Sequence, residues 1–474
     1  MRLSQALRLD TLPRIALVGS GGKSTALFKI GSELIEAGET SATVLLTATT
    51  HMSTEQLGLA NTHIVLNEKK DFDLFRNGFP RGLVLLTGPE VGEGRTKGLT
   101  FFLMQHLLVL GDQQKLPILI EADGSRQRPL KAPSDHEPVI PGWVEMVIVV
   151  CGLSGLGKPL ESKWVHRPEI FANLASLSPG DIVTPEGIRQ VMINPIGGLK
   201  GIPVRAKRVA LLNQADTEEL QAAGNWLAGK LLKDYHSIII ASLAPWEYSF
   251  TKPRRKGLDK SSLPLSQKVT PDGTDRIYAV HESVAGIILA AGGSNRMGKN
   301  KQVLTWRGEP MVRHVALTAL AAGLSPVVVV TGSSAGEVES ALRELPVSFK
   351  HNPNWESGQS SSVIVGLQAL PPQVGAAVFL LADQPQVPAE LVRGLVETHA
   401  INLPQIVAPQ VMDQRANPVL FDRKVFPDLL SLTGDVGGRI LFSKYPITWV
   451  PWYDNSILLD VDTLEDYQHL LEIQ

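Results

Sequence analysis

The stretch RIALVGSGGKST, residues 14–25, joins an apolar run to a glycine-rich loop and then to a helix-forming segment. Glycine loops that lead from a buried strand into a helix present backbone N–H groups to phosphate oxygens. The loop is shorter than the usual GxxxxGK[ST] pattern, because Leu17 stands where that pattern has its first glycine. The stretch predicts the strand, loop and helix of an α/β fold that binds a phosphate group.

The same alternation of apolar runs and helix-like segments continues along the chain. In the first half the further runs cover residues 42–47, 82–88, 117–124, 145–152, 208–213 and 237–242. Runs that are rich in Val, Ile and Leu on both faces are typical of a parallel sheet covered on both sides. We therefore predict a P-loop-like parallel-sheet domain over residues 1–245.

A polar segment interrupts this pattern before it starts again. Residues 246–283 are rich in Pro, Lys, Ser and Gly and lack an apolar period, which predicts a linker. Apolar runs return at 285–293, 326–332, 376–383, 405–410 and 417–421. A second α/β domain is therefore expected over residues 284–474.

Composition narrows the class of protein. The chain has 474 residues, of which 43% are hydrophobic and 19% charged, and its formal net charge is -2. These values are typical of a globular protein with about two to four domains and argue against a nucleic-acid binder. Cys151 is the only cysteine, and no stretch reaches the ~20 apolar residues that span a bilayer. We expect a cytoplasmic protein that binds neither nucleic acid nor membrane.

The first glycine loop carries the groups that a nucleotide phosphate site needs. Its glycines allow close approach to the phosphates, its lysine would meet the outer phosphates, and a hydroxyl would reach Mg²⁺. The predicted nucleotide-binding residues are Gly19, Gly21, Gly22, Lys23, Ser24 and Thr25. The alternative is an ordinary glycine-rich turn with an exposed lysine.

Two later strand ends add polar groups to this site. Glu121 and Asp123 lie two apart at the end of an apolar run, so they face one side, and Asp123 is a candidate Mg²⁺ ligand. An aspartate that only forms the next turn is the alternative. Asn213 and Asp216 have the spacing of the N-K-x-D guanine-binding motif of GTPases, although Gln214 replaces the lysine. ATP and GTP both remain open as the nucleotide.

Six motifs occur in order within about residues 10–245: VGSGGKST, EADGSRQRPLKAP, DHEPVIP, GLGKPL, VHRPE and GGLKGIP. In these motifs the chain resembles the selenium-dependent hydroxylase accessory proteins (YqeC-like), which are associated with the maturation of molybdenum hydroxylases. The resemblance implies an accessory role in handling a cofactor, with a molybdenum hydroxylase as client, and names no reaction. A basic group in this region could bind a second anion or form an exposed loop: Arg126, Arg128, Lys131 and His136.

The second domain begins with GIILAAGGSNRMGKNKQVL, residues 286–304. Its small residues would let a nucleotide lie against the backbone, and the cations that follow would neutralise a triphosphate. The predicted nucleotide-binding residues are Leu289, Ala290, Ala291, Gly292 and Gly293, with Arg296 and Lys301 as the cations.

Carboxylates at two later positions are candidate ligands of Mg²⁺. Asp383 ends the apolar run AAVFLLAD, where it is placed either to hold the metal or to form a turn. Asp460 or Asp462, in LDVDT, could supply another ligand, and we select Asp462. Asp383, Arg296 and Lys301 are the predicted catalytic residues.

The pattern L-A-A-G-x-S-x-R-M-G-x-x-K resembles the nucleotidyltransferases that attach a nucleotide to the molybdenum cofactor. NPNWESGQSSSVIVGL, LLADQPQVP, GDVGGR and LDVDTLEDY agree in order, so that the resemblance spans about residues 284–474. LAAG together with DQP looks like the cytidylyltransferase (MocA-like) branch. The resemblance implies a Rossmann-like, GT-A-like fold that transfers CMP from CTP to molybdopterin, releases pyrophosphate and yields molybdopterin cytosine dinucleotide.

The same resemblance implies contacts to the base. Gly358, Ser361 and Ser362 occupy the matching position, although a serine here could instead cap a helix that begins near Val363. Asn417 stands where the relatives usually have histidine, so the acceptor side departs from the pattern. Two other functions stay open: a transferase that uses GTP or a sugar-phosphate acceptor, and a cofactor-carrying chaperone without catalysis.

Overall fold

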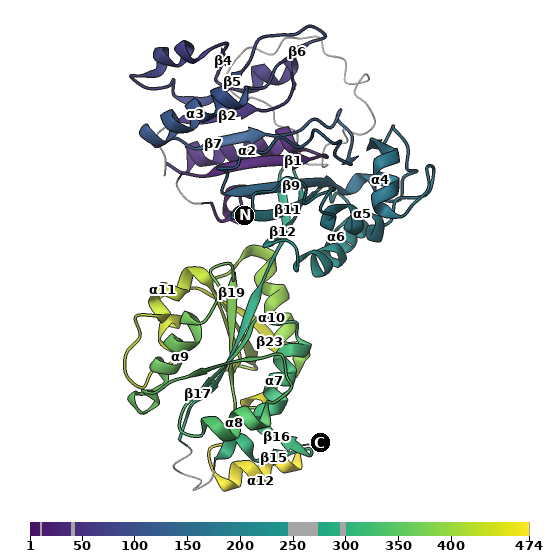
Figure 1. The fold of residues 1–474 in the computed structure, drawn as a ribbon. Coiled ribbons are helices and arrows are strands. Elements are labelled where there is room, and N and C mark those ends of the chain that lie inside the picture. Colours follow the sequence, from purple (N-terminus) through teal and green to yellow (C-terminus); the bar gives the residue numbers. More distant parts are fainter. Residues whose placement is uncertain (10–11, 39–42, 245–273, 294–299, 474) are drawn as a thin grey trace. The chain divides into compact units, whose positions relative to one another are not determined.

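Two β-sheets, one in each unit of the chain, organise the fold (Figure 1). The computed structural model describes residues 1–9, 12–38, 43–244, 274–293 and 300–473. Their contacts separate Met1–His281 from Glu282–Gln474. The predicted α/β class, with parallel strands in both units, is confirmed.

The first unit contains a nine-stranded sheet with the order β13-β12-β11-β9-β1-β7-β2-β5-β4. In chain order its strands are β1 (Arg14–Gly19), β2 (Thr43–Ala48), β4 (Thr62–Val65), β5 (Gly82–Thr87), β7 (Ile118–Glu121), β9 (Met146–Gly152), β11 (Lys207–Asn213), β12 (Ser237–Ser242) and β13 (Arg276–Glu282). Two short pairs lie outside it: β3 (Met52–Ser53) with β6 (Arg95–Thr96), and β8 (Leu130–Lys131) with β10 (Val165–His166).

Six α-helices lie in the described part of this unit, and the last four begin where the sequence supplies a threonine cap or a proline. They are α1 (Leu3–Leu7), α2 (Lys23–Glu36), α3 (Phe101–Gln113), α4 (Pro168–Ala175), α5 (Pro185–Ile193) and α6 (Glu218–Leu231). The side chains of Thr100, Thr184 and Thr217 accept hydrogen bonds from the first turns of α3, α5 and α6. Proline opens α4 and α5, where its missing N–H costs nothing.

Strand β1 lies in the middle of the sheet and determines where a site can form. It pairs in parallel with β7 on one side and with β9 on the other, and Ile15, Ala16 and Leu17 are fully buried. Strand β11 pairs in parallel with β9 and β12. The carboxyl ends of these strands therefore share one edge of the sheet, where parallel α/β sheets bind ligands.

The end of the predicted linker is not a linker in the structure. Arg276–Glu282 forms β13, which pairs with β12 at the edge of the first sheet. Ala279 and Val280 are buried there, so this short segment gains apolar burial that its polar flanks obscured in the sequence. Most of the remaining predicted linker, up to residue 273, lies outside the described residues.

The second unit contains an eight-stranded sheet with the order β18-β17-β14-β19-β22-β20-β21, in which β23 also pairs with β20. Its strands are β14 (Val284–Ala290), β17 (Val327–Thr331), β18 (Ser348–His351), β19 (Ala376–Leu381), β20 (Ile406–Val411), β21 (Gln414–Arg415), β22 (Val419–Asp422) and β23 (Ile447–Trp452). Strands β14, β17, β18 and β19 are parallel, whereas β22 runs antiparallel to β19 and β20.

Helices cover both faces of this second sheet and give two apolar cores. The helices are α7 (Met311–Ala321), α8 (Ala335–Ala341), α9 (Gln359–Gln368), α10 (Ala389–Asn402), α11 (Phe426–Leu429) and α12 (Leu464–Glu472). Buried residues of α7, α8 and α10 form one core, and those of α9 and α11 form the other. A smaller cluster joins α12 to Trp306 of the short hairpin β15 (Thr305–Trp306) and β16 (Glu309–Pro310).

Candidate functional site

The glycine loop of the first unit has a backbone that only glycine adopts without strain. Gly19, Gly21 and Gly22 have φ values of 92°, 83° and 119°, between the end of β1 and the start of α2. A Cβ on Gly21 would lie 2.4 Å from the Cα of Gly152, at the end of β9. The loop therefore packs directly on the neighbouring strand end.

The predicted polar residues of this loop converge on the end of β7. The amine of Lys23 donates to the carbonyl of Gly19 at 2.7 Å and lies 3.1 Å from Oδ1 of Asp123. Ser24 Oγ donates to Oε2 of Glu121 at 2.8 Å. Burial raises the pKa of Glu121, which Lys23 and the Ser24 hydroxyl only partly offset. Thr25, the last residue of the predicted loop, is half-buried in α2.

Asp123 is also held by groups that the sequence did not assign to it. Its Oδ2 accepts from the backbone N–H of Gly19 at 3.0 Å and lies 2.7 Å from the amine of Lys131. Lys131 and Arg167 each lie 2.9 Å from Oε2 of Glu137. Asp123 is therefore an ion-pair partner here, and the Mg²⁺ role predicted for it stays a prediction.

The predicted basic group does not act as one patch. The Lys131 side chain is 1% exposed and paired with two carboxylates, whereas Arg126 and His136 are exposed. Because a buried ammonium group needs such partners, Lys131 holds the site together rather than facing solvent as a free cation. The sequence contained these residues, but their pairing depends on β8 and β10 coming together.

Asn213 and Asp216 lie at the same edge of the sheet. Asn213 Nδ2 donates to the carbonyl of Gly21 at 2.8 Å, and its Oδ1 accepts from the N–H of Leu243 at 3.0 Å. Asp216 Oδ1 accepts a hydrogen bond from Ser242 Oγ. The structure thus brings Asn213 to the glycine loop and places Asp216 against Ser242, the last residue of β12.

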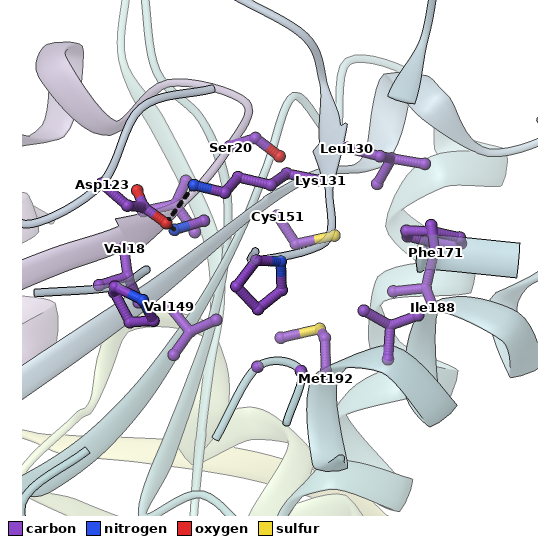
Figure 2. Close-up of a pocket in the computed structure, with 17 residues that line it drawn as sticks. Val18, Ser20, Asp123, Leu130, Lys131, Val149, Cys151, Phe171, Ile188 and Met192 are labelled. Carbon is purple, nitrogen blue, oxygen red and sulfur yellow. Dashed lines mark hydrogen bonds and ion pairs between the residues drawn. The ribbon is translucent and has the colours of Figure 1, made fainter. Parts of the chain in front are cut away.

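An apolar pocket adjoins the loop (Figure 2). Its wall includes Cys151, Phe171, Ile188 and Met192, and the Lys131–Asp123 ion pair lies at one side. Burial raises the pKa of Cys151 to about 12, so its thiol stays protonated and unreactive near neutral pH. The pocket has room for a small apolar group beside the glycine loop.

In the second unit the small-residue loop follows β14. Ala290 and Ala291 are buried, and Gly292 is exposed. Gly292 accepts hydrogen bonds through its carbonyl from Gln302 Nε2 and Ser333 Oγ, each at 3.3 Å. Leu289, in β14, and Gly293, after it, are both half-buried, while Arg296 lies outside the described residues.

Lys301, Asp383 and Asp462 meet beside this loop. The amine of Lys301 lies 2.6 Å from Oδ2 of Asp383 and 2.7 Å from Oδ1 of Asp462. Burial lowers the pKa of Lys301, but the two carboxylates outweigh it, so the pKa is raised and the amine stays charged. Asp460 accepts a hydrogen bond from Gln384 Nε2 at 2.5 Å, and burial together with the charges of Asp383 and Asp462 raises its pKa.

The predicted base-contact residues form the start of α9. This helix begins at Gln359, four residues before the predicted Val363, and Gly358 precedes it with a φ of 108°. Asn352 Nδ2 donates to the hydroxyls of both Ser361 and Ser362, at 2.8 and 2.9 Å. Asn352 is 1% exposed and was not predicted; its position directly after β18 was the available signal.

A second pocket lies between β19, β22 and residues 437–439 of this unit. Apolar groups line it, including Phe379 and Phe421, together with the polar side chains of Asn417 and Arg439. Asn417 is 8% exposed.

Among the residues that the structure describes, no group of three or more His, Cys, Asp or Glu side chains is arranged as a metal site. In the same ranges, no helix is long and apolar enough to cross a membrane.

Comparison with known proteins matches each unit to a different family. Residues 15–169 match the family described as YqeC protein, and residues 286–448 match the MobA-like NTP transferase domain. The "Uncharacterized protein YqeC" of Escherichia coli (strain K12) is 32% identical over 208 residues, which are 42% of this chain and 75% of that protein.

The similar proteins also include relatives of nucleotidyltransferases. The "Nicotine blue oxidoreductase" of Paenarthrobacter nicotinovorans is 30% identical over 198 residues, which are 40% of this chain and 96% of that protein. The "Probable molybdenum cofactor guanylyltransferase" of Bacillus cereus (strain Q1) is 28% identical over 137 residues, which are 29% of this chain and 66% of that protein. The second unit is thus a nucleotidyltransferase domain related to enzymes of the molybdenum cofactor.

Proposed function

Because the chain belongs to the YqeC family in its first unit and to the MobA-like NTP transferase family in its second, we propose that it is an enzyme of molybdenum cofactor maturation. The second unit transfers CMP from CTP to molybdopterin or its molybdenum form. The first unit binds a nucleotide and assists in handling the cofactor for a molybdenum hydroxylase. The proposed setting is the cytoplasm.

The observation that carries the proposal is the convergence of Lys301, Asp383 and Asp462 beside residues 289–293. A triphosphate on this loop would meet a charged amine at its phosphates and carboxylates suited to a divalent cation. Arg296 completes the predicted set of cations.

The donor atoms fit Mg²⁺. Oδ1 of Asp383 is buried and has no hydrogen-bond partner among the residues described, and its Oδ2 already faces a cation, the amine of Lys301. Asp383 and Asp462 would hold the metal together with phosphate oxygens. Bound there, Mg²⁺ would neutralise charge that develops on the phosphates.

The proposed reaction places little covalent chemistry on the protein. A terminal phosphate oxygen of the acceptor forms a bond to the α-phosphorus of CTP, and the bond to the β-phosphate oxygen breaks to release pyrophosphate. Lys301 neutralises the triphosphate, and the loop residues hold it in line with the acceptor. The pocket lined by Asn417 and Arg439 is the proposed acceptor site.

The first experiment measures pyrophosphate from purified protein with molybdopterin or its molybdenum form, Mg²⁺ and each NTP in turn. We expect release with CTP, its loss when EDTA removes the metal, and a fall of at least about a hundredfold in Asp383→Asn. The matched control is Asp428→Asn, since Asp428 pairs with Lys444 and Tyr445 at the surface.

The named guanylyltransferase relative makes GTP the second candidate substrate. Release with GTP in place of CTP would replace the cytidylyl assignment by a guanylyl one. If none of the nucleotides gives pyrophosphate, the transferase function is contradicted and the cofactor-carrying chaperone remains.

A further inference from the structure

Three loops at the carboxyl edge of the first sheet are tied together by one buried amide. Asn213, 2% exposed, donates to Gly21 of the phosphate loop and accepts from Leu243, which follows β12. Both hydrogen-bonding ends of its side chain are therefore used to fix the loop after β11 against the other two. The segment that begins at Asn213 is therefore fixed to the glycine loop at Gly21.

Asp216 presents a carboxylate at this junction. One oxygen accepts a hydrogen bond from Ser242, while the residue is exposed and its other oxygen has no partner within the described part of the chain. The adjacent N–H of Ala215 is bonded to Ala241 at 3.0 Å, which ties the loop to the end of β12. Ser242 thus fixes one oxygen of the carboxylate, and the other oxygen can accept a hydrogen bond from a ligand.

We infer that the first unit selects a guanine nucleotide and that Asp216 reads the base, an inference that rests on the proposed nucleotide binding at the glycine loop. Guanine presents two N–H donors side by side, on N1 and on its exocyclic N2, and an ionised carboxylate is an acceptor only. Adenine has an acceptor at N1 and no amino group at C2, so it leaves the carboxylate unpaired.

The local helix does not account for Asp216. Helix α6 takes its N-cap from Thr217, whose side chain accepts from the N–H of Leu220. Gln214, which stands in place of the lysine of the guanine motif, accepts from Ser154 Oγ at 2.6 Å and so turns toward the end of β9. Base selection consequently depends on Asp216, with Ser242 as its positioning residue.

The test is calorimetry on the full chain with GTP, ATP and XTP, in the presence of excess CTP to occupy the second unit. The wild-type protein should bind GTP about a hundredfold more tightly than ATP, since ATP loses two charge-assisted hydrogen bonds. In Asp216→Asn this preference should pass to XTP, because xanthine has a carbonyl at C2 that can accept from the new amide N–H. Gain of XTP binding also demonstrates that the variant is folded.

Two further variants complete the design. Asp234→Asn, at the far end of α6, is the matched carboxylate-to-amide control and should leave the GTP preference unchanged. Ser242→Ala should weaken GTP binding several-fold without admitting ATP, because it frees the carboxylate to rotate but keeps its charge.

The outcomes separate this inference from the proposal on which it rests. If ATP and GTP bind with equal affinity and Lys23→Ala removes the binding of both, guanine selection is overturned and nucleotide binding is retained. Equal GTP affinity in wild-type protein and Asp216→Asn would also overturn it. If Lys23→Ala removes the binding of none of the nucleotides, the nucleotide role of the first unit itself would be overturned.

Discussion

Lys131 illustrates how a single buried charge organises the first unit. Its side chain is 1% exposed and contacts both Asp123 and Glu137, so neither carboxylate is left alone in a low-dielectric environment. Glu137 also forms an ion pair with the guanidinium group of Arg167, so the network includes this third element of the chain. Because Asp123 also contacts Lys23 and Glu137 also contacts Arg167, removing one member takes away one of several ion pairs in the network.

Glu137 gives this network a measurable pH dependence. Burial alone would raise its pKa, but the hydrogen bonds from Arg167 and Lys131 outweigh burial and lower the pKa from 4.5 to about 2. A carboxyl group with a lowered folded pKa stabilises the fold above its ordinary pKa, and this stability is lost as the pH falls. We expect urea unfolding to show a loss of stability between about pH 4.5 and pH 2 that is shallower in Glu137→Gln.

The exposed Glu55→Gln is the control for that measurement, because Glu55 lies in the short 3-10 helix of residues 54–59 away from the network. It should retain the wild-type slope. Identical slopes in wild-type protein and Glu137→Gln would mean that the network contributes nothing to acid sensitivity.

Residue types and motif positions pointed to side chains that the structure brings together. Lys301 was selected as a cation after the small-residue loop, Asp383 as the end of an apolar run and Asp462 as part of LDVDT. Their charged atoms meet although they are far apart in the sequence. Asn352 and Ser242 were missed, since each acts through a hydrogen bond to a residue that is not its neighbour in the chain. Such partners become visible only when the strand order is known.

At the scale of elements, the glycine loop depends on the strand beside it. Gly21 has a φ of 83°, and an added Cβ would lie 2.4 Å from the backbone of Gly152. We expect Gly21→Ala to destabilise the first unit by about 1–3 kcal/mol and to abolish its nucleotide binding, because the loop must move away from β9. Thermal unfolding and calorimetry measure the two effects.

Gly229→Ala provides the comparison within the same unit. Gly229 lies inside α6, and a Cβ there meets nothing within 4 Å, so alanine should stabilise the helix by up to about 1 kcal/mol. If Gly21→Ala behaved in the same way, the strained loop would not be needed for the fold.

The sequence patterns predicted the positions of the strands better than the boundaries and directions of some elements. The apolar runs located the strands of both sheets, because buried parallel strands are apolar throughout. The start of α9 was placed near Val363, since the polar run 359–362 hides its first turn, where Ser360 and Ser362 are buried and hydrogen-bonded. The antiparallel direction of β22 follows from tertiary pairing and has no local pattern.

At the scale of the whole molecule, the chain is two units with separate sheets, each carrying its own glycine loop at the end of a central strand. Family membership of each unit could be predicted, because the motifs are local in sequence. The limit of the first unit was predicted at residue 245, whereas its contacts continue to His281 through β13, whose pairing with β12 has no local sequence pattern.

That last strand has a practical consequence for dividing the protein. Strand β13 covers the edge of β12, whose sequence SIIIAS is buried throughout. A fragment that stops at residue 245 would expose this edge as a row of unpaired N–H and C=O groups, which is a template for edge-to-edge aggregation. We expect light scattering to show growing particles for residues 1–245 and none for residues 1–282; equal behaviour would mean that β12 does not need its cover.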